Sequence, residues 1–150
     1  MDPEAVSLKY LREHCLFGGI TDDKIKAILP LMEEVSFAAG SDILSQGEFG
    51  DRIYFILKGS VEVLKDHGDG TLQRLDIIPE GETIGEMEVL EPERGAATIR
   101  ALEPIQALSL SNACLYHVFR EDPATFTLII LNLARLIVRR MRKLQERVIG

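Results

Sequence analysis

The stretches that decide the fold are GEFGDRIYFILKGSVEVL, residues 47–64, and IGEMEVLEPERGAATIRALE, residues 84–103. In the first, Val61 and Val63 alternate with side chains of the opposite face, as in a half-buried strand, and Gly59 marks a tight turn before them. The second combines glycines, glutamates and a proline in a segment that can form one or two helical turns. Together they predict a β-rich domain whose strands are interrupted by one short helix.

Short β-rich runs bounded by Gly, Pro or Asp surround these stretches. They cover residues 34–37, 42–45, 53–57, 60–65, 71–77, 97–102 and 105–110. Strands this short and this regularly spaced are typical of a sandwich, roll or barrel. Apolar residues on the inward strand faces are expected to form the core: Ile56, Val61, Val63, Ile77, Ile99 and Leu108.

Segments with apolar side chains at helical spacing lie on both sides of the strands. Before the strands, they are residues 5–14 and 21–32. After the strands we expect a short helix and then a long one, which begins at the Asp122-Pro123 pair and runs to about Val148. Proline suits the first position of a helix because its missing N–H would have no partner there.

The charge of the chain is unevenly distributed. The formal net charge is −7, which would repel phosphate backbones, so we expect no nucleic-acid partner. The last helix is nevertheless basic, with a cluster formed by Arg139, Arg140, Arg142, Lys143 and Arg147. This cluster can complement the helix dipole and the acidic remainder of the chain, or it can attract an acidic partner, a membrane surface or nucleic acid.

No membrane or export segment is expected. The N-terminus is acidic and lacks the basic start and apolar run of a signal peptide. The most apolar stretch, residues 125–138, contains Asn132 and Arg135 and is shorter than the ~20 residues that span a bilayer. We therefore expect a cytoplasmic protein that does not bind membranes.

Motifs of enzymatic chemistry are missing from the sequence. His14, His67 and His117 are scattered, without the spacing that gives a metal two ligands from one element. There is no G-x-S-x-G elbow and no phosphate-binding loop of the G-x-x-x-x-G-K-[ST] type. We expect no catalytic residue, no metal site and no enzyme activity, which leaves a regulatory ligand-binding module or a plain interaction protein.

The segment around Gly85 has the layout of a phosphate cradle. A glycine at the start of a short helix lets a ligand approach exposed N–H groups, and a nearby arginine can pair with phosphate. The same residues also fit a simpler interpretation, in which Thr83-x-x-Glu86 is a capping box that closes a turn.

The two quoted stretches resemble the cyclic nucleotide-binding domain family, which includes the catabolite activator protein and the regulatory subunits of cyclic-AMP-dependent kinase. The resemblance runs from about residue 16 to 144. It implies an eight-stranded antiparallel β-roll, jelly-roll-like, preceded by short helices and followed by a short and a long helix. The chain would then be a single domain, with N-terminal helices at 1–33, the roll at 34–110 and C-terminal helices at 111–150. The phosphate-binding cassette of the family would lie at 81–98.

The resemblance also implies roles for cassette residues. Gly85 would allow close approach of the ligand, Glu86 would hold the ribose 2′-hydroxyl, and an arginine would pair with the cyclic phosphate. Cyclic AMP and cyclic GMP are then the candidate ligands, and no other cofactor is implied. The candidate ligand-binding residues are Gly85, Glu86, Met87, Arg94, Gly95 and Ala96.

The cassette departs from the family pattern at its arginine. A gap-free alignment puts Gly95 at the arginine position and Arg94 one residue early, which on a strand turns a side chain to the other face. Glu88 also replaces a small apolar residue. We therefore expect weak or lost cyclic-nucleotide affinity, in a module that acts through dimerisation or a protein partner. The alternative is a working sensor in which a local bulge turns Arg94 toward the ligand beside Glu86.

The last predicted helix has an apolar seam that favours dimerisation. Its first half is apolar almost all round, and one face of a roll cannot cover both sides of a helix. We expect a homodimer, whereas the alternative is a monomer whose helix folds back across its own roll. The expected interface residues are Phe126, Ile130, Leu133, Ile137, Met141 and Leu144, with Val148 continuing the seam.

Overall fold

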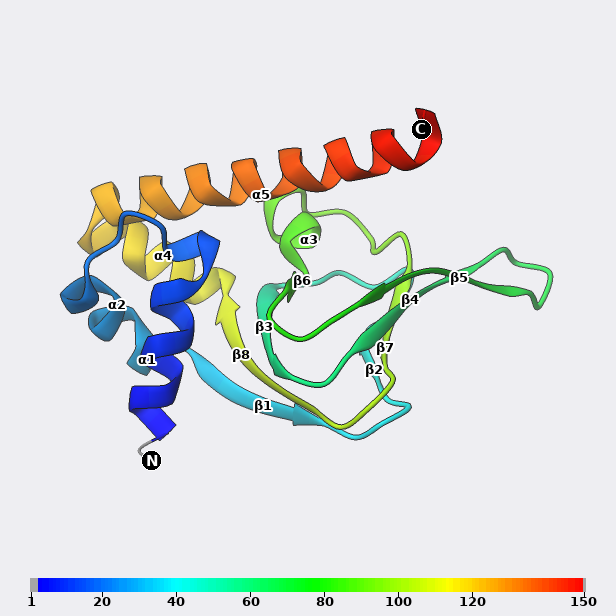
Figure 1. Cartoon of the computed structure of the whole chain (residues 1–150), viewed down its shortest axis with the longest axis horizontal. Helices are drawn as coiled ribbons and strands as arrows, with labels where there is room; N and C mark the ends of the chain where they lie inside the picture. The colour runs from blue at the N-terminus through cyan, green and yellow to red at the C-terminus, as the bar shows by residue number, and fades with distance from the viewer. Residues whose placement is uncertain (1–2, 150) are drawn as a thin grey trace. The chain divides into compact units, whose positions relative to one another are not determined.

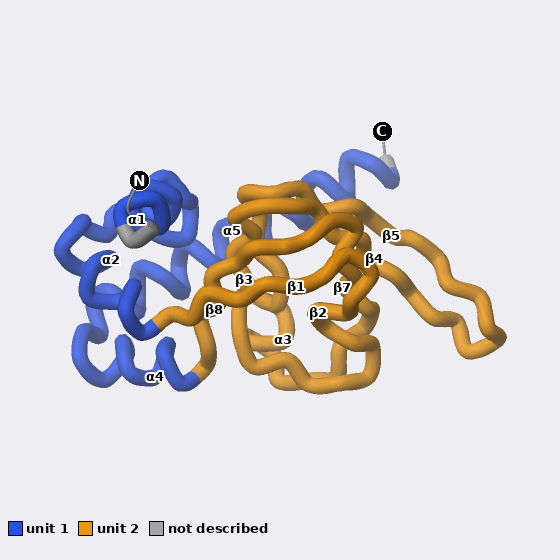
Figure 2. Tube along the Cα trace, turned by 90° about the horizontal axis from the view of Figure 1, so that it is seen from below, with its two compact units in different colours: residues 1–31, 113–150 blue, residues 32–112 orange. Residues whose placement is uncertain are grey.

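The computed structural model of the chain describes residues 3–149. The chain forms two compact units (Figure 2). The β unit is Met32–Asn112, and the helical unit comprises the residues up to Leu31 together with those from Ala113 onward. The segment of the expected cassette lies entirely in the β unit.

The β unit contains two four-stranded antiparallel sheets, with the strand orders β1-β8-β3-β6 and β2-β7-β4-β5 (Figure 1). This confirms the predicted eight-stranded β-roll flanked by helices. The two-residue strand β6 was not predicted, because it is too short to show alternation. The strands are β1 Glu33–Phe37, β2 Asp42–Leu44, β3 Arg52–Lys58, β4 Val61–Asp66, β5 Leu72–Ile78, β6 Thr83–Ile84, β7 Thr98–Ala101 and β8 Ile105–Ser111.

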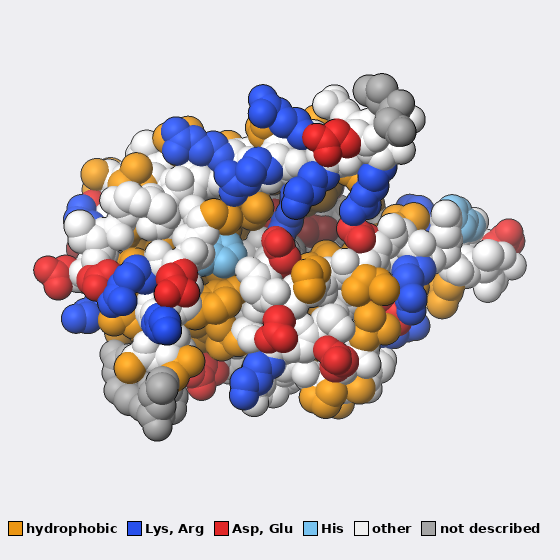
Figure 3. All heavy atoms as spheres, in the orientation of Figure 1, with side chains coloured by type: hydrophobic (Ala, Val, Ile, Leu, Met, Phe, Trp, Pro, Cys, Tyr) orange, Lys and Arg blue, Asp and Glu red, His pale blue; other side chains and the backbone are white. Residues whose placement is uncertain are grey.

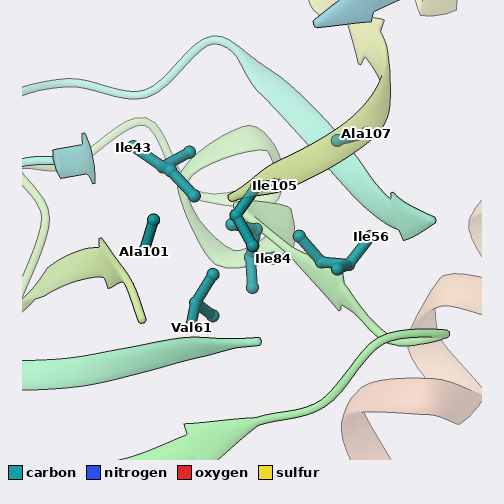
Figure 4. Packing of buried hydrophobic residues seen from close by; sticks show 7 residues of the cluster. All are labelled: Ile43, Ile56, Val61, Ile84, Ala101, Ile105 and Ala107. Carbon is teal, nitrogen blue, oxygen red and sulfur yellow. The ribbon is translucent and has the colours of Figure 1, made fainter. Parts of the chain in front are cut away.

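Apolar side chains from both sheets form one core cluster in the β unit (Figure 4). Its buried members are Ile43, Ile56, Val61, Ile84, Ala101, Ile105 and Ala107. The predictions for Ile56, Val61 and Leu108 are confirmed, since all three are buried. Val63 and Ile99 are half-buried.

The prediction that Ile77 is buried was wrong. Ile77 is exposed and lies on β5, the last strand of its sheet. It is paired with Glu62 of β4, and cross-strand partners point to the same side of a sheet. Since Glu62 alternates with Val61 and Val63, this register places Ile77 on the face opposite the core.

The helical unit combines short N-terminal helices with two helices from the end of the chain. Helix α2 ends earlier than the predicted residue 32 and is followed by a 3-10 turn that contains Pro30, whose ring removes an amide donor. The helices are α1 Pro3–Glu13, α2 Asp22–Ile28, α4 Asn112–Glu121 and α5 Pro123–Ile149, with 3-10 turns η1 Cys15–Phe17 and η2 Leu29–Leu31.

Helix α5 begins where the Asp122-Pro123 pair predicts. The carboxylate of Asp122 accepts hydrogen bonds from the backbone N–H of Thr125 at 3.2 Å and from its hydroxyl at 2.6 Å. Lys24 lies 3.1 Å from the same carboxylate. The hydrogen bonds from Thr125 and Lys24 hold the pKa of Asp122 below its usual range.

The polar residue in the apolar stretch of α5 has a structural role. Asn132 is buried, and its Nδ2 donates to the carbonyl oxygens of Leu16 at 3.0 Å and Gly18 at 2.9 Å. These bonds fasten η1 to α5 within the helical unit. No helix in residues 3–149 has the length and apolarity that a bilayer span needs.

Candidate ligand-binding cassette

Gly85 stands where β6 ends and the short helix α3 (Glu86–Leu90) begins. Its φ of +88° lies in the left-handed region, which favours glycine. A Cβ atom at this position would overlap the carbonyl oxygen of Arg52 on β3. Both the backbone angle and the close approach of β3 therefore require glycine, so Gly85 is needed for the fold of the cassette whether or not a ligand binds.

The first residues of α3 differ sharply in exposure. Glu86 is only 6% exposed, whereas the following Met87 is exposed. Glu88 packs against the loop before β3, because a Cβ added at Gly50 would lie 2.9 Å from the Cβ of Glu88. Glu88, which replaces a small apolar residue of the family pattern, therefore occupies a tightly packed position.

Arg94 is exposed, and its guanidinium is engaged by the loop before β3. Its Nη1 donates to the carbonyl oxygen of Gly47 at 2.8 Å. Its Cζ lies 5.1 Å from the ring centroid of Phe49, a cation–π distance. The backbones of Phe49 and Arg94 also form an isolated antiparallel bridge. These contacts hold Arg94 against residues 47–49.

Gly95 is fixed by backbone hydrogen bonds to the same loop. Its N–H donates to the carbonyl oxygen of Glu48 at 2.8 Å, and its carbonyl accepts from the N–H of Gly47 at 2.9 Å. A Cβ at Gly95 would lie 3.4 Å from its nearest neighbours, an ordinary van der Waals distance. There is therefore room for a Cβ atom at this position.

Ala96, the last candidate ligand-binding residue, is exposed, and its carbonyl accepts a hydrogen bond from Lys65 Nζ at 2.9 Å. The sequence did not single out Gly47, Phe49 and Gly50 as neighbours of the cassette. The only signal for this loop was its two glycines, Gly47 and Gly50, which indicate a turn before β3 but do not show that the turn contacts the cassette. The roles of the six candidate residues in ligand binding stay predictions.

The expected interface residues of α5 become more exposed along the helix. Leu133 is fully buried within the single chain, and Phe126, Ile130 and Ile137 are half-buried. Met141 and Leu144 are 56% and 55% exposed. The C-terminal half of the predicted seam is therefore its most exposed part.

Comparison with known proteins assigns the family. The family described as "Cyclic nucleotide-binding domain" matches residues 34–122, more than half of the chain. The chain therefore belongs to the cyclic nucleotide-binding domain family, of the type found in catabolite activator proteins and kinase regulatory subunits. This is a family of regulatory domains, generally non-enzymatic, and it makes cyclic AMP and cyclic GMP the candidate ligands.

Individual relatives agree with this assignment. The cyclic AMP receptor protein of Thermus thermophilus is 28% identical over 128 residues, which are 85% of this chain and 57% of that protein. The crystal structure of the catabolite activator protein of Thermus thermophilus superposes with a TM-score of 0.75 at 27% identity, covering 89% of this chain and 61% of that one. A cyclic nucleotide-binding domain from Methylobacillus flagellatus has the same fold, with a TM-score of 0.86 at 24% identity, covering 97% and 82% of the two chains. The chain thus spans somewhat more than half the length of the curated relative.

Proposed function

We propose that this protein is a regulatory module whose cassette binds cyclic AMP and cyclic GMP weakly or not at all, and which acts through homodimerisation or a protein partner. The observation that carries the proposal is the position of Arg94. Its guanidinium is bonded to Gly47 and lies over Phe49. The one arginine near the family position is therefore already engaged elsewhere.

Releasing Arg94 toward a ligand has an energetic cost. A hydrogen bond from a charged donor contributes ~1.5–3 kcal/mol and an exposed cation–π contact ~0.5–1 kcal/mol. A cyclic phosphate would have to replace both contacts before it gained anything. The bonds that join Gly95 to Glu48 and Gly47 also oppose a shift of the backbone at this point.

The electrostatic environment adds to this cost. Glu88 lies in the first turn of α3, directly after the buried Glu86 and the exposed Met87. Like charges ~4 Å apart repel by about 1 kcal/mol in water and by several times more where partly buried. A phosphate approaching the start of α3 would meet this repulsion without an arginine to offset it.

The proposed dimer uses helix α5. Its exposed apolar side chains, including Met141 and Leu144, would otherwise stay in water. Lys and Arg side chains gather along the same helix (Figure 3). We assign Arg135, Arg139 and Arg142, which lie opposite the seam, to the solvated side of the helix rather than to nucleic acid, because the whole chain is net negative.

The cassette proposal is tested by rebuilding the missing arginine. Gly95→Arg with Glu88→Ala should raise the affinity for cyclic AMP or cyclic GMP by roughly 10- to 100-fold, measured by isothermal titration calorimetry. The matched control is Gly95→Ala with Glu88→Ala, which makes the same backbone change without a guanidinium. An arginine variant that binds no better than this control would contradict the proposal.

A further inference from the structure

An aromatic cluster lies on the surface of the helical unit where α4 meets α5. It consists of Tyr116 and Phe119 on α4 and Phe126 on α5. The rings of Tyr116 and Phe119 are 6.3 Å apart, and those of Phe119 and Phe126 are 5.2 Å apart in an edge-to-face arrangement. Tyr116 is 61% and Phe119 48% exposed, so the cluster leaves much of its ring surface in water.

The composition of the aromatic cluster is that of an interface rather than of an ordinary surface. The chain has six Phe and three Tyr, and three of these nine rings gather within eleven residues. The guanidinium of Arg120 lies over the ring of Tyr116, 5.9 Å from its centroid. Tyr, Phe and Arg are the residues enriched in the cores of protein interfaces.

The aromatic cluster is continuous with the apolar seam of α5. Phe126 is the first residue of that seam, and Ile130, one helical turn later, is half-buried like it. Phe119 reaches Phe126 from α4 through the edge-to-face contact. A partner that covers the seam from Phe126 onward therefore also meets Phe119 and Tyr116.

The area of the seam alone falls short of a stable dimer interface. An apolar side chain that is about half exposed offers on the order of 100 Å². The most exposed side chains of the seam, Met141, Leu144 and Val148, would then supply roughly 300 Å², whereas a standard interface buries ~800 Å² per partner. Tyr116 and Phe119 add ~200 Å² of apolar surface, and the polar rim that comes with any interface supplies the remainder.

We infer that a second copy of this chain covers the aromatic cluster, so that the dimer interface is built from α4 and α5 of each copy rather than from α5 alone. This inference rests on the proposed homodimer. In a twofold interface each residue of the patch acts twice, once in each copy. Loss of both α4 rings should therefore weaken the dimer strongly.

A tryptophan probe tests whether the cluster is covered. The chain contains no Trp, so Tyr116→Trp gives the protein a single indole at the cluster. As the Tyr116→Trp variant is concentrated, its emission should shift to shorter wavelength, and the midpoint of this shift should equal the midpoint of dimerisation measured by sedimentation equilibrium. The control is Leu72→Trp at an exposed position of β5, whose emission should not change.

An alanine variant provides the second readout. Tyr116→Ala with Phe119→Ala should weaken the dimer at least tenfold while its circular dichroism spectrum stays unchanged. If the unmodified protein dimerises but the indole emission of the Tyr116→Trp variant stays constant, or the alanine variant dimerises equally well, the inference is overturned and the proposed homodimer stands. An unmodified protein that stays monomeric at high concentration overturns the homodimer and the inference together.

Discussion

Replacing Gly85 with alanine should lower the free energy of unfolding by roughly 3–5 kcal/mol, measured by chemical denaturation. An L-residue in the left-handed region costs ~1–2 kcal/mol. The added Cβ would in addition overlap the carbonyl oxygen of Arg52, so α3 would have to move away from β3. Backbone strain at a position without room to relax is among the causes of the largest losses of stability that single substitutions produce.

Gly81→Ala is the matched control for this substitution. Gly81 has an almost identical φ of +92°, but nothing lies within 4 Å of a Cβ added there. Gly81→Ala should therefore lower the free energy of unfolding by only ~1–2 kcal/mol, the cost of an L-residue in the left-handed region. Equal losses for the two variants would show that the close approach of β3 to Gly85 contributes nothing.

Replacing both Met141 and Leu144 with glutamate should convert the proposed dimer into a folded monomer. Both side chains are more than half exposed in the single chain, so the substitutions leave its own core intact. In a twofold interface they would place four carboxylates among apolar side chains, and burying each unpaired charge costs several kcal/mol. We expect the dimer to weaken by more than about 1000-fold in sedimentation equilibrium.

Arg135→Glu with Arg139→Glu is the control for the dimer variant. It places two carboxylates on the opposite side of α5, at exposed positions. This variant should keep the dimer, with an unchanged helical circular dichroism signal. A dimer that survives Met141→Glu with Leu144→Glu would exclude the C-terminal half of α5 from the interface.

Seven of the eight strands could be predicted from the sequence because each is a local pattern bounded by turn residues, whereas the two-residue β6 is too short to show such a pattern. Ile77 shows where this reasoning fails. Its side chain is apolar and lies in a predicted strand, but its pairing with Glu62 decides which face it occupies. Pairing depends on contacts between strands, and a single strand does not reveal it. Leu133 is a similar case, since helical spacing placed it on the seam but its burial depends on tertiary packing.

The candidate cassette could be located from its glycines and its glutamate, and Gly85 among them is required by local backbone geometry. The surroundings of Arg94 could not be predicted in the same way. Its partners, Gly47 and Phe49, lie more than forty residues earlier in the chain. The alignment placed the arginine one residue early, but only the fold brings residues 47–49 to it. A side chain's position in a motif therefore does not by itself establish its availability to a ligand.

Calorimetric titration of the unmodified protein with cyclic AMP and cyclic GMP, beside the Arg94→Ala variant, tests the central claim most directly. We expect no saturation by either nucleotide below about 1 mM, which corresponds to less than ~4 kcal/mol of binding free energy, and no difference between the two proteins. Binding at micromolar or lower concentration that Arg94→Ala abolishes would contradict the account. It would mean that Arg94 leaves Gly47 and Phe49 to hold the cyclic phosphate, and that the domain is a working cyclic-nucleotide sensor.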